Sequence, residues 1–568
     1  MAEHLSDSEA GFAATAGKQL VVYAIFAVVG VALLMWALQA LASLVGSSTT
    51  DAQAVNLEDN SITIAIREEP PQLNTTVATD AVSGLVLGHV IEGLLRMNMH
   101  DKLEGAVAHT WEVKDKQATF WLREDARWSD GEPVTAHDFI FGWTVALLPE
   151  TASEYSFLLY HIKNARAVNE GKMPPEALGL SAPDDYTLVV DLEHPVPFFD
   201  KMMTFPTYMP VRQDFYEATE GRFGADAWEL LYNGPFVISQ WVHGSSLLLE
   251  RNPHYWDQDR IHLDKINIGY ITSDATATLN FFKDEKIAYT TLITENLDAA
   301  LQSGWRIKQV EDGVAFFLEF NHRNERITSN HNLRRAMQLV LNMDELVYKV
   351  TKQPGYLPGR SLFPHFLMGV EDTFRNEYPA PEQVIDKALA LEHLAKAKVE
   401  LGVDEIPPLV LLSGDNPISS IQSEWVQASL KRNLGLEVRI DKQIFKQRLA
   451  KMTAGEFDMV LAGWGPDYDD PLTFGDLFAS YNLNNRGRYE SEEMDRLITI
   501  AQTELDPRKR MDAFGGIQQL LYDDVVILPM YERGVTFVVH PQLKDLKTRV
   551  IGTDFDFTEA YIVPPDEV

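Results

Sequence analysis

The chain has 568 residues, which is long for one ordinary domain and enough to bury several cores. Its formal net charge of -34 argues against nucleic acid as a partner, because too few cations are present to neutralise a run of phosphates. The absence of cysteine excludes disulfides, thiol nucleophiles, cysteine-ligated zinc and a lipid-modified cysteine.

An uncharged, mostly apolar run over residues 19–46 follows a polar tail over residues 1–18. The hydrocarbon core of a bilayer needs about 20 apolar residues, so this run predicts a single transmembrane anchor. A cleavable signal has an apolar core of only about 7–15 residues. Residues 40–42 and 52–54 resemble cleavage sites, so we expect a retained anchor and keep cleavage as the alternative.

Small and polar residues over 47–60 predict a flexible linker, and globular structure is expected to begin near Ser61. From there Ile62, Ile64 and Ile66 alternate with small or polar residues, as a half-buried strand requires. No Lys or Arg occurs from residue 51 until Arg67, which favours an exported carboxy-terminal side.

The first half of the chain is rich in predicted strands and turns. Alternation predicts strands over residues 119–123, 187–192, 236–241 and 247–250, and a Gly-containing turn joins the last two into a hairpin. Thr135 is placed to cap a helix over residues 136–147, with Asp138 in the first turn, where the helix dipole favours a carboxylate.

From residue 381 onward, predicted strands alternate with helices. The strands cover residues 409–412, 437–440 and 457–461, and this spacing predicts an α/β unit with a largely parallel sheet. Two further helices are expected around residues 494–501 and 511–521, before a strand-rich tail that begins at Ile527.

A rigid acidic turn follows the strand that ends near Leu461. Two glycines, two prolines, two aromatic residues and three carboxylates lie in the ten residues 462–471. This composition suits close backbone approach, flat apolar walls and a fixed negative charge, although such turns are often only turns. The aspartates at 467, 469 and 470 lack the 12-residue calcium pattern, so we expect no metal.

Motifs of common catalytic sites are missing. The sequence has no Gly-rich phosphate loop, no Gly-x-Ser-x-Gly elbow and no His-Glu-x-x-His helix, so we expect neither a cofactor nor an enzyme. Paired carboxylates would permit glycosidase chemistry in principle, but an acidic chain offers many such pairs by chance.

Several ordered segments, taken together, resemble the oligopeptide- and dipeptide-binding proteins of bacterial ABC importers, the family 5 extracellular solute-binding proteins. The matching segments are residues 92–95, 120–143 (most clearly 128–139), 233–236, 251–256, 333–336, 457–474 and 529–531. The resemblance covers roughly residues 61–546. It implies the α/β, two-lobed periplasmic-binding-protein fold, with a hinge and an additional inserted subdomain.

This resemblance also implies the domain boundaries. We expect the first lobe to be assembled from residues 61–92, 205–270 and 531–568, the inserted subdomain from 93–204 and the second lobe from 271–530.

Peptide-binding members of the family use an Ala-Gly-Trp-x-x-Asp-Tyr segment to hold the peptide's α-ammonium group and main chain. The resemblance therefore assigns Asp467 to the ammonium group, with Trp464 beside it. The full set of expected ligand-binding residues is Asp467, Trp464, Gly463, Gly465, Tyr468, Asn233, Tyr155 and Thr79. Packing remains the alternative for Tyr155, and a hairpin role remains the alternative for Asn233.

Two features depart from the family pattern: the uncleaved anchor, and Leu461 where some longer-peptide binders have an arginine for the peptide carboxylate. We expect a monomeric, membrane-tethered receptor on the periplasmic side of the cell membrane that captures short peptides for an ABC permease, with no nucleic acid partner. The same scaffold carrying a nickel chelate or an oligosaccharide is the alternative, and a cleft enzyme or chaperone is a more remote one.

Overall fold

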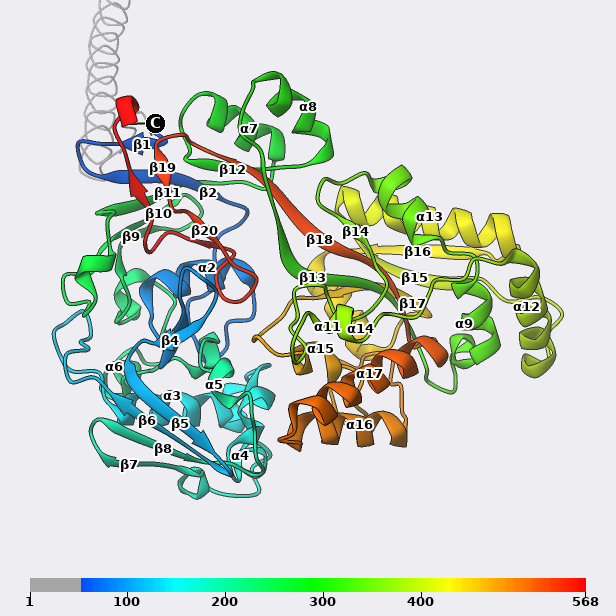
Figure 1. Cartoon of the computed structure of the whole chain (residues 1–568), viewed down its shortest axis with the longest axis horizontal. Helices are drawn as coiled ribbons and strands as arrows, with labels where there is room; N and C mark the ends of the chain where they lie inside the picture. Colours follow the sequence, from blue (N-terminus) through cyan, green and yellow to red (C-terminus); the bar gives the residue numbers. More distant parts are fainter. Residues whose placement is uncertain (1–52, 568) are drawn as a thin grey trace, which may run out of the picture. The chain divides into compact units, whose positions relative to one another are not determined.

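Two large sheets organise residues 53–567, the part of the chain that the computed structural model describes (Figure 1). The predicted tail and anchor over residues 1–46 lie outside the described residues. Across residues 53–567, no helix has the length and apolar character needed to cross a bilayer.

The first-lobe sheet has five strands in the order β1 (Val55–Asn56), β2 (Ser61–Ile66), β11 (Lys265–Ile271), β10 (Ser246–Arg251) and β9 (Phe236–Val242). Only the β2–β11 pair is parallel. The alternating isoleucines of β2 are buried, as predicted, and α2 (Ala81–Val90) contributes to the same core.

Ordered structure begins earlier than the predicted linker allowed. Val55 of β1 pairs with Ile62 of β2, and the buried Ala54 donates its backbone N–H to the carbonyl of Glu285 at 2.7 Å. These backbone bonds hold residues that composition alone predicted to be flexible. Local composition could not reveal them, because strand pairing depends on partners elsewhere in the chain.

The inserted subdomain contains a four-stranded antiparallel sheet in the order β5 (Ala108–Lys114), β6 (Gln117–Leu122), β8 (Thr187–Asp191) and β7 (Leu180–Asp184). Helix α3 (Ala136–Leu147) follows the predicted cap, where Asp138 accepts the Thr135 backbone N–H at 2.8 Å. Smaller elements here are the β3 (Leu95–Met97) and β4 (Leu103–Gly105) hairpin, α4 (Ala165–Asn169), α5 (Phe199–Met202) and the nearby α6 (Gln213–Ala218).

The second large sheet has seven strands. Its order is β12 (Tyr289–Leu292), β18 (Ile527–Val539), β13 (Lys308–Phe320), β17 (Met459–Trp464), β15 (Leu409–Gly414) and β16 (Val438–Gln443), with β14 (Leu357–Pro358) paired to β18. β15 pairs in parallel with both β17 and β16, which confirms the predicted α/β unit.

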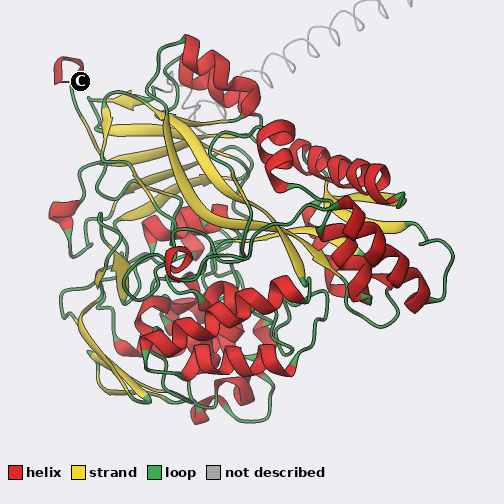
Figure 2. Cartoon of the chain, turned by 45° about the vertical axis from the view of Figure 1, so that its right-hand side comes forward, coloured by secondary structure: helices red, strands yellow, loops and turns green. Residues whose placement is uncertain are grey.

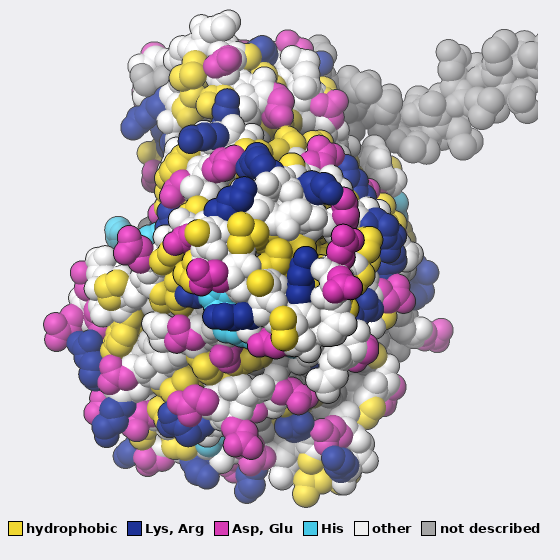
Figure 3. Space-filling model, turned by 90° about the vertical axis from the view of Figure 1, so that its right-hand side faces the viewer, with side chains coloured by type: hydrophobic (Ala, Val, Ile, Leu, Met, Phe, Trp, Pro, Cys, Tyr) yellow, Lys and Arg dark blue, Asp and Glu magenta, His cyan; other side chains and the backbone are white. Residues whose placement is uncertain are grey.

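Helices surround the parallel part of this sheet (Figure 2). They are α9 (His331–Gln338), α12 (Lys387–Leu401), α13 (Pro417–Leu434), α14 (Phe445–Ala454), α16 (Glu492–Thr503) and α17 (Pro507–Asp523), with the short α10 (Met343–Glu345) and α11 (Phe374–Glu377). On the face drawn in Figure 3, acidic and basic side chains are interspersed over the second lobe.

Strands β13 and β18 are 13 residues long each and run from one lobe to the other, and we call them the crossover strands (Figure 1). Their pairing is interrupted between Glu311 and Ala315, where Gly313 has a φ of 74°. A Cβ at Gly313 would lie 2.4 Å from Val550 Cγ1, so glycine is required both for the backbone conformation and for the close approach.

Residues 272–307 lie on the first-lobe side of this interruption, although they were predicted to belong to the second lobe. Helices α7 (Ala275–Lys283) and α8 (Thr294–Gln302) share a small core with Ala65, Tyr270 and Val538. The reason is the register of β12, whose Leu292 pairs with Thr536 in the far half of β18.

The carboxy-terminal segment ends in the first lobe. Its short strands are β19 (Leu543–Lys544), β20 (Lys547–Thr548), β21 (Phe555–Asp556) and β22 (Tyr561–Ile562). Phe555 and Phe557 join the first-lobe core, and the Phe557 backbone N–H donates to His89 Nε2 of α2 at 2.9 Å.

Candidate functional site

The acidic turn after β17 is fixed by a buried ion pair. Asp470 accepts the Leu472 backbone N–H at 3.0 Å, and its two oxygens accept hydrogen bonds from Arg510 of α17 at 2.7 and 2.5 Å. Helix α15 (Leu472–Gly475) begins directly after it. The contact with Leu472 and the paired, planar contact with Arg510 hold the turn in one position.

Asp467 lies in the same turn but has no cationic partner among residues 53–567. Its backbone N–H donates to Thr473 Oγ1 at 2.9 Å, and its Oδ1 accepts the Tyr155 hydroxyl at 3.3 Å. Burial, and to a smaller extent the nearby Asp476, raise the pKa of this carboxyl to about 8, while the Tyr155 hydrogen bond acts in the opposite direction. The carboxylate form is therefore costly until a cation arrives.

A cavity of about 340 Å³ lies beside Asp467 and is lined by both lobes and the inserted subdomain. Its volume falls at the lower end of the range of about 300–1,000 Å³ that is usual for small-ligand sites. Six of the predicted ligand-binding residues line it: Thr79, Tyr155, Gly463, Trp464, Gly465 and Asp467. Segments separated by almost 400 residues of sequence are thus brought to one site.

Two predicted site residues lie elsewhere. Asn233 is buried and forms two hydrogen bonds with the backbone of Glu92, accepting its N–H and donating to its carbonyl, each at 2.9 Å. Its amide is used to join two segments of the first lobe, so it does not line the cavity. Tyr468 stacks on Phe198 of the inserted subdomain, with ring centroids 5.8 Å apart and planes 8° apart.

The glycines of the turn leave backbone accessible. β17 pairs with β15 only at Met459 and Val460, so the second edge of its carboxy-terminal half is not covered by a strand of the described chain. Gly463 is exposed, and a Cβ there would lie 2.7 Å from the ring of Phe316 on β13. The bare backbone from Gly463 to Gly465 therefore faces the cavity.

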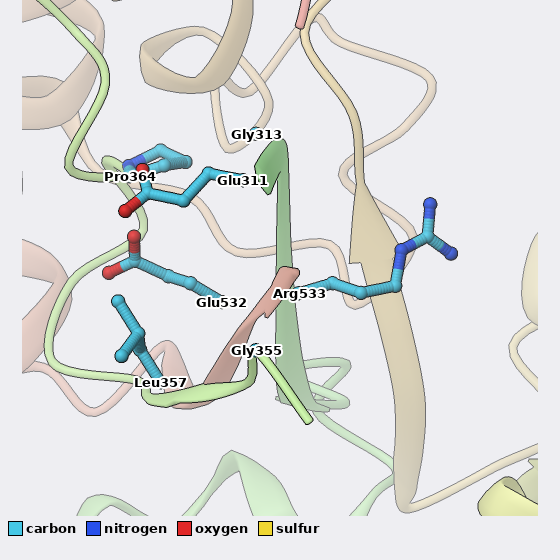
Figure 4. Close-up of a pocket in the computed structure, with 7 residues that line it drawn as sticks. All are labelled: Glu311, Gly313, Gly355, Leu357, Pro364, Glu532 and Arg533. Carbon is cyan, nitrogen blue, oxygen red and sulfur yellow. The ribbon is translucent and has the colours of Figure 1, made fainter. Parts of the chain in front are cut away.

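Four charged residues of the cavity were not anticipated: Arg67, Asp312, Arg533 and Asp554. Asp312 and Arg533 form an ion pair between the two crossover strands. Figure 4 shows the adjacent Glu532 and Arg533 on opposite faces of β18, as strand alternation requires. In the sequence, Arg533 could have been noticed because Glu532 and Arg533 interrupt a strand that is otherwise mostly apolar. Its ion-pair partner Asp312 could not, because the two residues lie more than 200 positions apart.

Glu532 faces away from the cavity and connects β18 to an irregular loop of the second lobe. Its carboxylate accepts the His365 backbone N–H at 2.9 Å and His365 Nδ1 at 2.8 Å, with Arg375 at 3.4 Å. Hydrogen bonding to Glu532 raises the pKa of His365. Within residues 53–567, no group of three or more His, Asp or Glu side chains is placed to hold a metal ion.

Two lobes joined by crossover strands, with a cavity between them, define the class of ligand-enclosing binding proteins. The model of the bacterial extracellular solute-binding proteins, family 5, matches residues 102–485. The chain belongs to this family and has its two-lobed α/β fold.

Relatives align with most of the length of this chain. The oligopeptide-binding protein OppA of Bacillus subtilis (strain 168) is 31% identical over 511 residues, which cover 88% of this chain and 92% of OppA. OppA of Listeria monocytogenes bound to peptide is 30% identical, with a TM-score of 0.78 over 89% of this chain and 99% of that chain.

A third relative, the murein tripeptide-binding protein MppA of Escherichia coli, is 25% identical and aligns with a TM-score of 0.79 over 90% of this chain and 100% of that chain. MppA in its unliganded open form aligns with a TM-score of only 0.69, over 90% of this chain and 99% of that chain. Residues 53–567 are therefore arranged less like the open form than like the peptide-bound Listeria protein.

Proposed function

We propose that this chain is the solute-binding receptor of an ABC importer, which captures short peptides in the cavity and delivers them to a membrane permease. The observation that carries the proposal is the carboxyl of Asp467, which faces the cavity without a cation. Its place in the turn matches the family segment that holds a peptide's α-ammonium group.

An ammonium group supplies what Asp467 lacks. A carboxylate in a largely enclosed site is stable only when it is paired and hydrogen-bonded, and Tyr155 alone provides a single neutral donor. A bound ammonium group adds charge-assisted hydrogen bonds, which are shorter and stronger than neutral ones. A neutral sugar would leave this carboxyl protonated and without charge-assisted hydrogen bonds, which favours a peptide over an oligosaccharide.

Main-chain recognition accompanies the ammonium contact. The uncovered edge of β17 offers backbone groups at Gly463 and Trp464, so an extended peptide can add to it as a strand. Such bonding is independent of peptide sequence. The aromatic side chains of Tyr155, Phe205 and Trp464 then provide walls for the peptide's side chains.

Tethering is part of the proposal. An anchor over residues 19–46 would hold a monomeric receptor on the periplasmic side of the cell membrane, where it raises the local receptor concentration beside the permease without adding any contact. The function is binding and release, with no catalytic step.

The test is the affinity of the full-length protein for Ala-Ala-Ala, measured by titration calorimetry for wild type and Asp467→Asn. We expect the substitution to weaken binding by about 1.5–3 kcal/mol, or roughly 10- to 150-fold in Kd, because a charged hydrogen-bond acceptor is lost. N-acetyl-Ala-Ala-Ala, which has no ammonium group, should bind weakly to both proteins.

Asp469→Asn is the matched control. It removes the same charge from the same turn. It also removes a half-exposed ion pair with Lys201 Nζ at 3.6 Å, which contributes little, while the Asp469 backbone carbonyl that accepts Lys201 Nζ at 2.7 Å is kept. Its affinity should stay close to that of wild type. If Asp467→Asn binds the free tripeptide as tightly as wild type does, the assignment of the ammonium site is wrong.

A further inference from the structure

The cavity is lined by six charged side chains, and their pairing specifies the charge of the ligand. The carboxylates are Asp80, Asp312, Asp467 and Asp554, and the cations are Arg67 and Arg533. A charge that lines a cavity is stabilised by an opposite charge close to it, so we ask for each of the six which group balances it.

Three of the six are balanced within the protein. Asp80 caps α2, where its carboxylate accepts the Ser83 backbone N–H at 2.8 Å and the Ser83 hydroxyl at 2.7 Å. Its charge also lies at the positive end of the helix dipole. Asp312 and Arg533 neutralise each other across the crossover strands.

Three charges remain for the ligand: Asp467, Arg67 and Asp554. Under the proposed function, the α-ammonium group of the peptide pairs with Asp467. Arg67 extends from the end of β2, is exposed, and forms no ion pair or side-chain hydrogen bond with residues 53–567. It is the one unpaired cation of the cavity lining, so it is the available partner for the peptide's carboxylate. The carboxylate would then bind at Arg67 and not at the position of Leu461, where some longer-peptide binders have an arginine.

Asp554 is then left over. It lies between Thr553 and Phe555, is open to the cavity, and accepts no side-chain hydrogen bond from the described residues. Arg67 and Arg533 are close enough to influence it electrostatically, but neither forms an ion pair with it. A zwitterionic peptide would occupy Asp467 and Arg67 and leave the Asp554 carboxylate without a counter-charge.

We propose that Asp554 receives a basic side chain of the bound peptide, so that the preferred ligand is a short peptide with one net positive charge. This inference rests on the proposed function, and it adds a residue that determines specificity. Desolvation raises the pKa of Asp554, Arg533 and Arg67 act in the opposite direction, and Asp312 adds to the increase.

The test compares tripeptides of equal shape and different charge on the full-length protein. Ala-Ala-Ala is varied by placing lysine, norleucine or glutamate at each of the three positions, and Kd is measured for each peptide. At the best position, lysine should bind about tenfold or more tightly than norleucine, the gain of one charged hydrogen bond, and glutamate should bind more weakly than both.

Asp554→Asn should reduce the preference for lysine over norleucine to less than about twofold. Asp259→Asn removes an exposed carboxylate from the surface and should keep the full preference. Thermal unfolding of each variant checks that the fold is retained.

The outcomes separate the two proposals. Tripeptide binding with no lysine preference at any position, or a preference that survives in Asp554→Asn, overturns the role of Asp554 and leaves the peptide receptor standing. Failure of every tripeptide to bind the wild-type protein overturns the proposed function and this inference with it.

Discussion

Under the proposed function, the protonation of Asp467 should couple peptide binding to pH. Its pKa of about 8 in the empty cavity means that most molecules carry a proton there at pH 7, while an ammonium partner lowers the pKa in the complex. The complex therefore binds fewer protons than the free protein, so affinity rises with pH up to about 8. Above that the peptide's own α-amine, with a pKa of about 7.7–8.0, loses its charge.

Calorimetry measures this coupling directly. At pH 7, binding of Ala-Ala-Ala should release most of one proton, so the observed enthalpy should change with the ionisation enthalpy of the buffer. Asp467→Asn should lose this dependence. An enthalpy that is the same in phosphate and in Tris for the wild type would mean that Asp467 is already ionised in the empty cavity.

At the scale of single elements, the turn after β17 depends on α17 for its position. The Asp470 and Arg510 side chains are 3% and 7% exposed, so Asp470→Asn leaves a buried guanidinium without its counter-charge. We expect the free energy of unfolding to fall by about 3–5 kcal/mol, measured by urea denaturation. Glu493→Gln, which breaks the exposed Arg496–Glu493 pair on α16, is the control and should change stability far less.

Periodicity in the sequence predicted the elements with one buried face. The alternating isoleucines of β2 and the apolar strands β15 and β17 were identified because their pattern reflects burial alone. The crossover strand β13, which begins at Lys308, shows where such patterns stop being informative. Its first residues are polar and are held by pairing with Val535–Phe537 across the sheet, a contact that no local pattern encodes.

The site residues divide in the same way, into those that a local sequence pattern marks and those that only the fold brings together. Asp467, Trp464 and the two glycines lie in one turn whose composition is unusual, so they could be singled out from the sequence. Arg67 and Asp554 come from the ends of the described chain and meet in the cavity only through the fold. Asn233 lies in a motif that is typical of the family, but its buried amide joins backbone segments and does not line the cavity.

On the scale of the whole molecule, contacts between the inserted subdomain and the second lobe close the cavity. Phe198 stacks on Tyr468, Arg510 lies 4.8 Å from the Phe198 ring, and Lys201 Nζ donates to the Asp469 carbonyl at 2.7 Å. Tyr155 adds its hydrogen bond to Asp467. Because these contacts exist only when the two parts meet, they favour the closed state over the open one.

Phe198→Ala should therefore weaken peptide binding although Phe198 does not line the cavity. The apparent Kd equals the intrinsic Kd divided by the closed fraction, so a loss of closed molecules should raise it by about tenfold. Small-angle scattering should show a larger radius of gyration for the ligand-free variant than for wild type, and saturating peptide should remove the difference.

Phe281→Ala is the control for this prediction. The Phe281 ring stacks on Tyr270, with ring centroids 4.2 Å apart, away from the cavity, so this variant should lose stability and keep the wild-type Kd. Equal Kd and equal radius for Phe198→Ala and wild type would show that the aromatic stack does not contribute to closure.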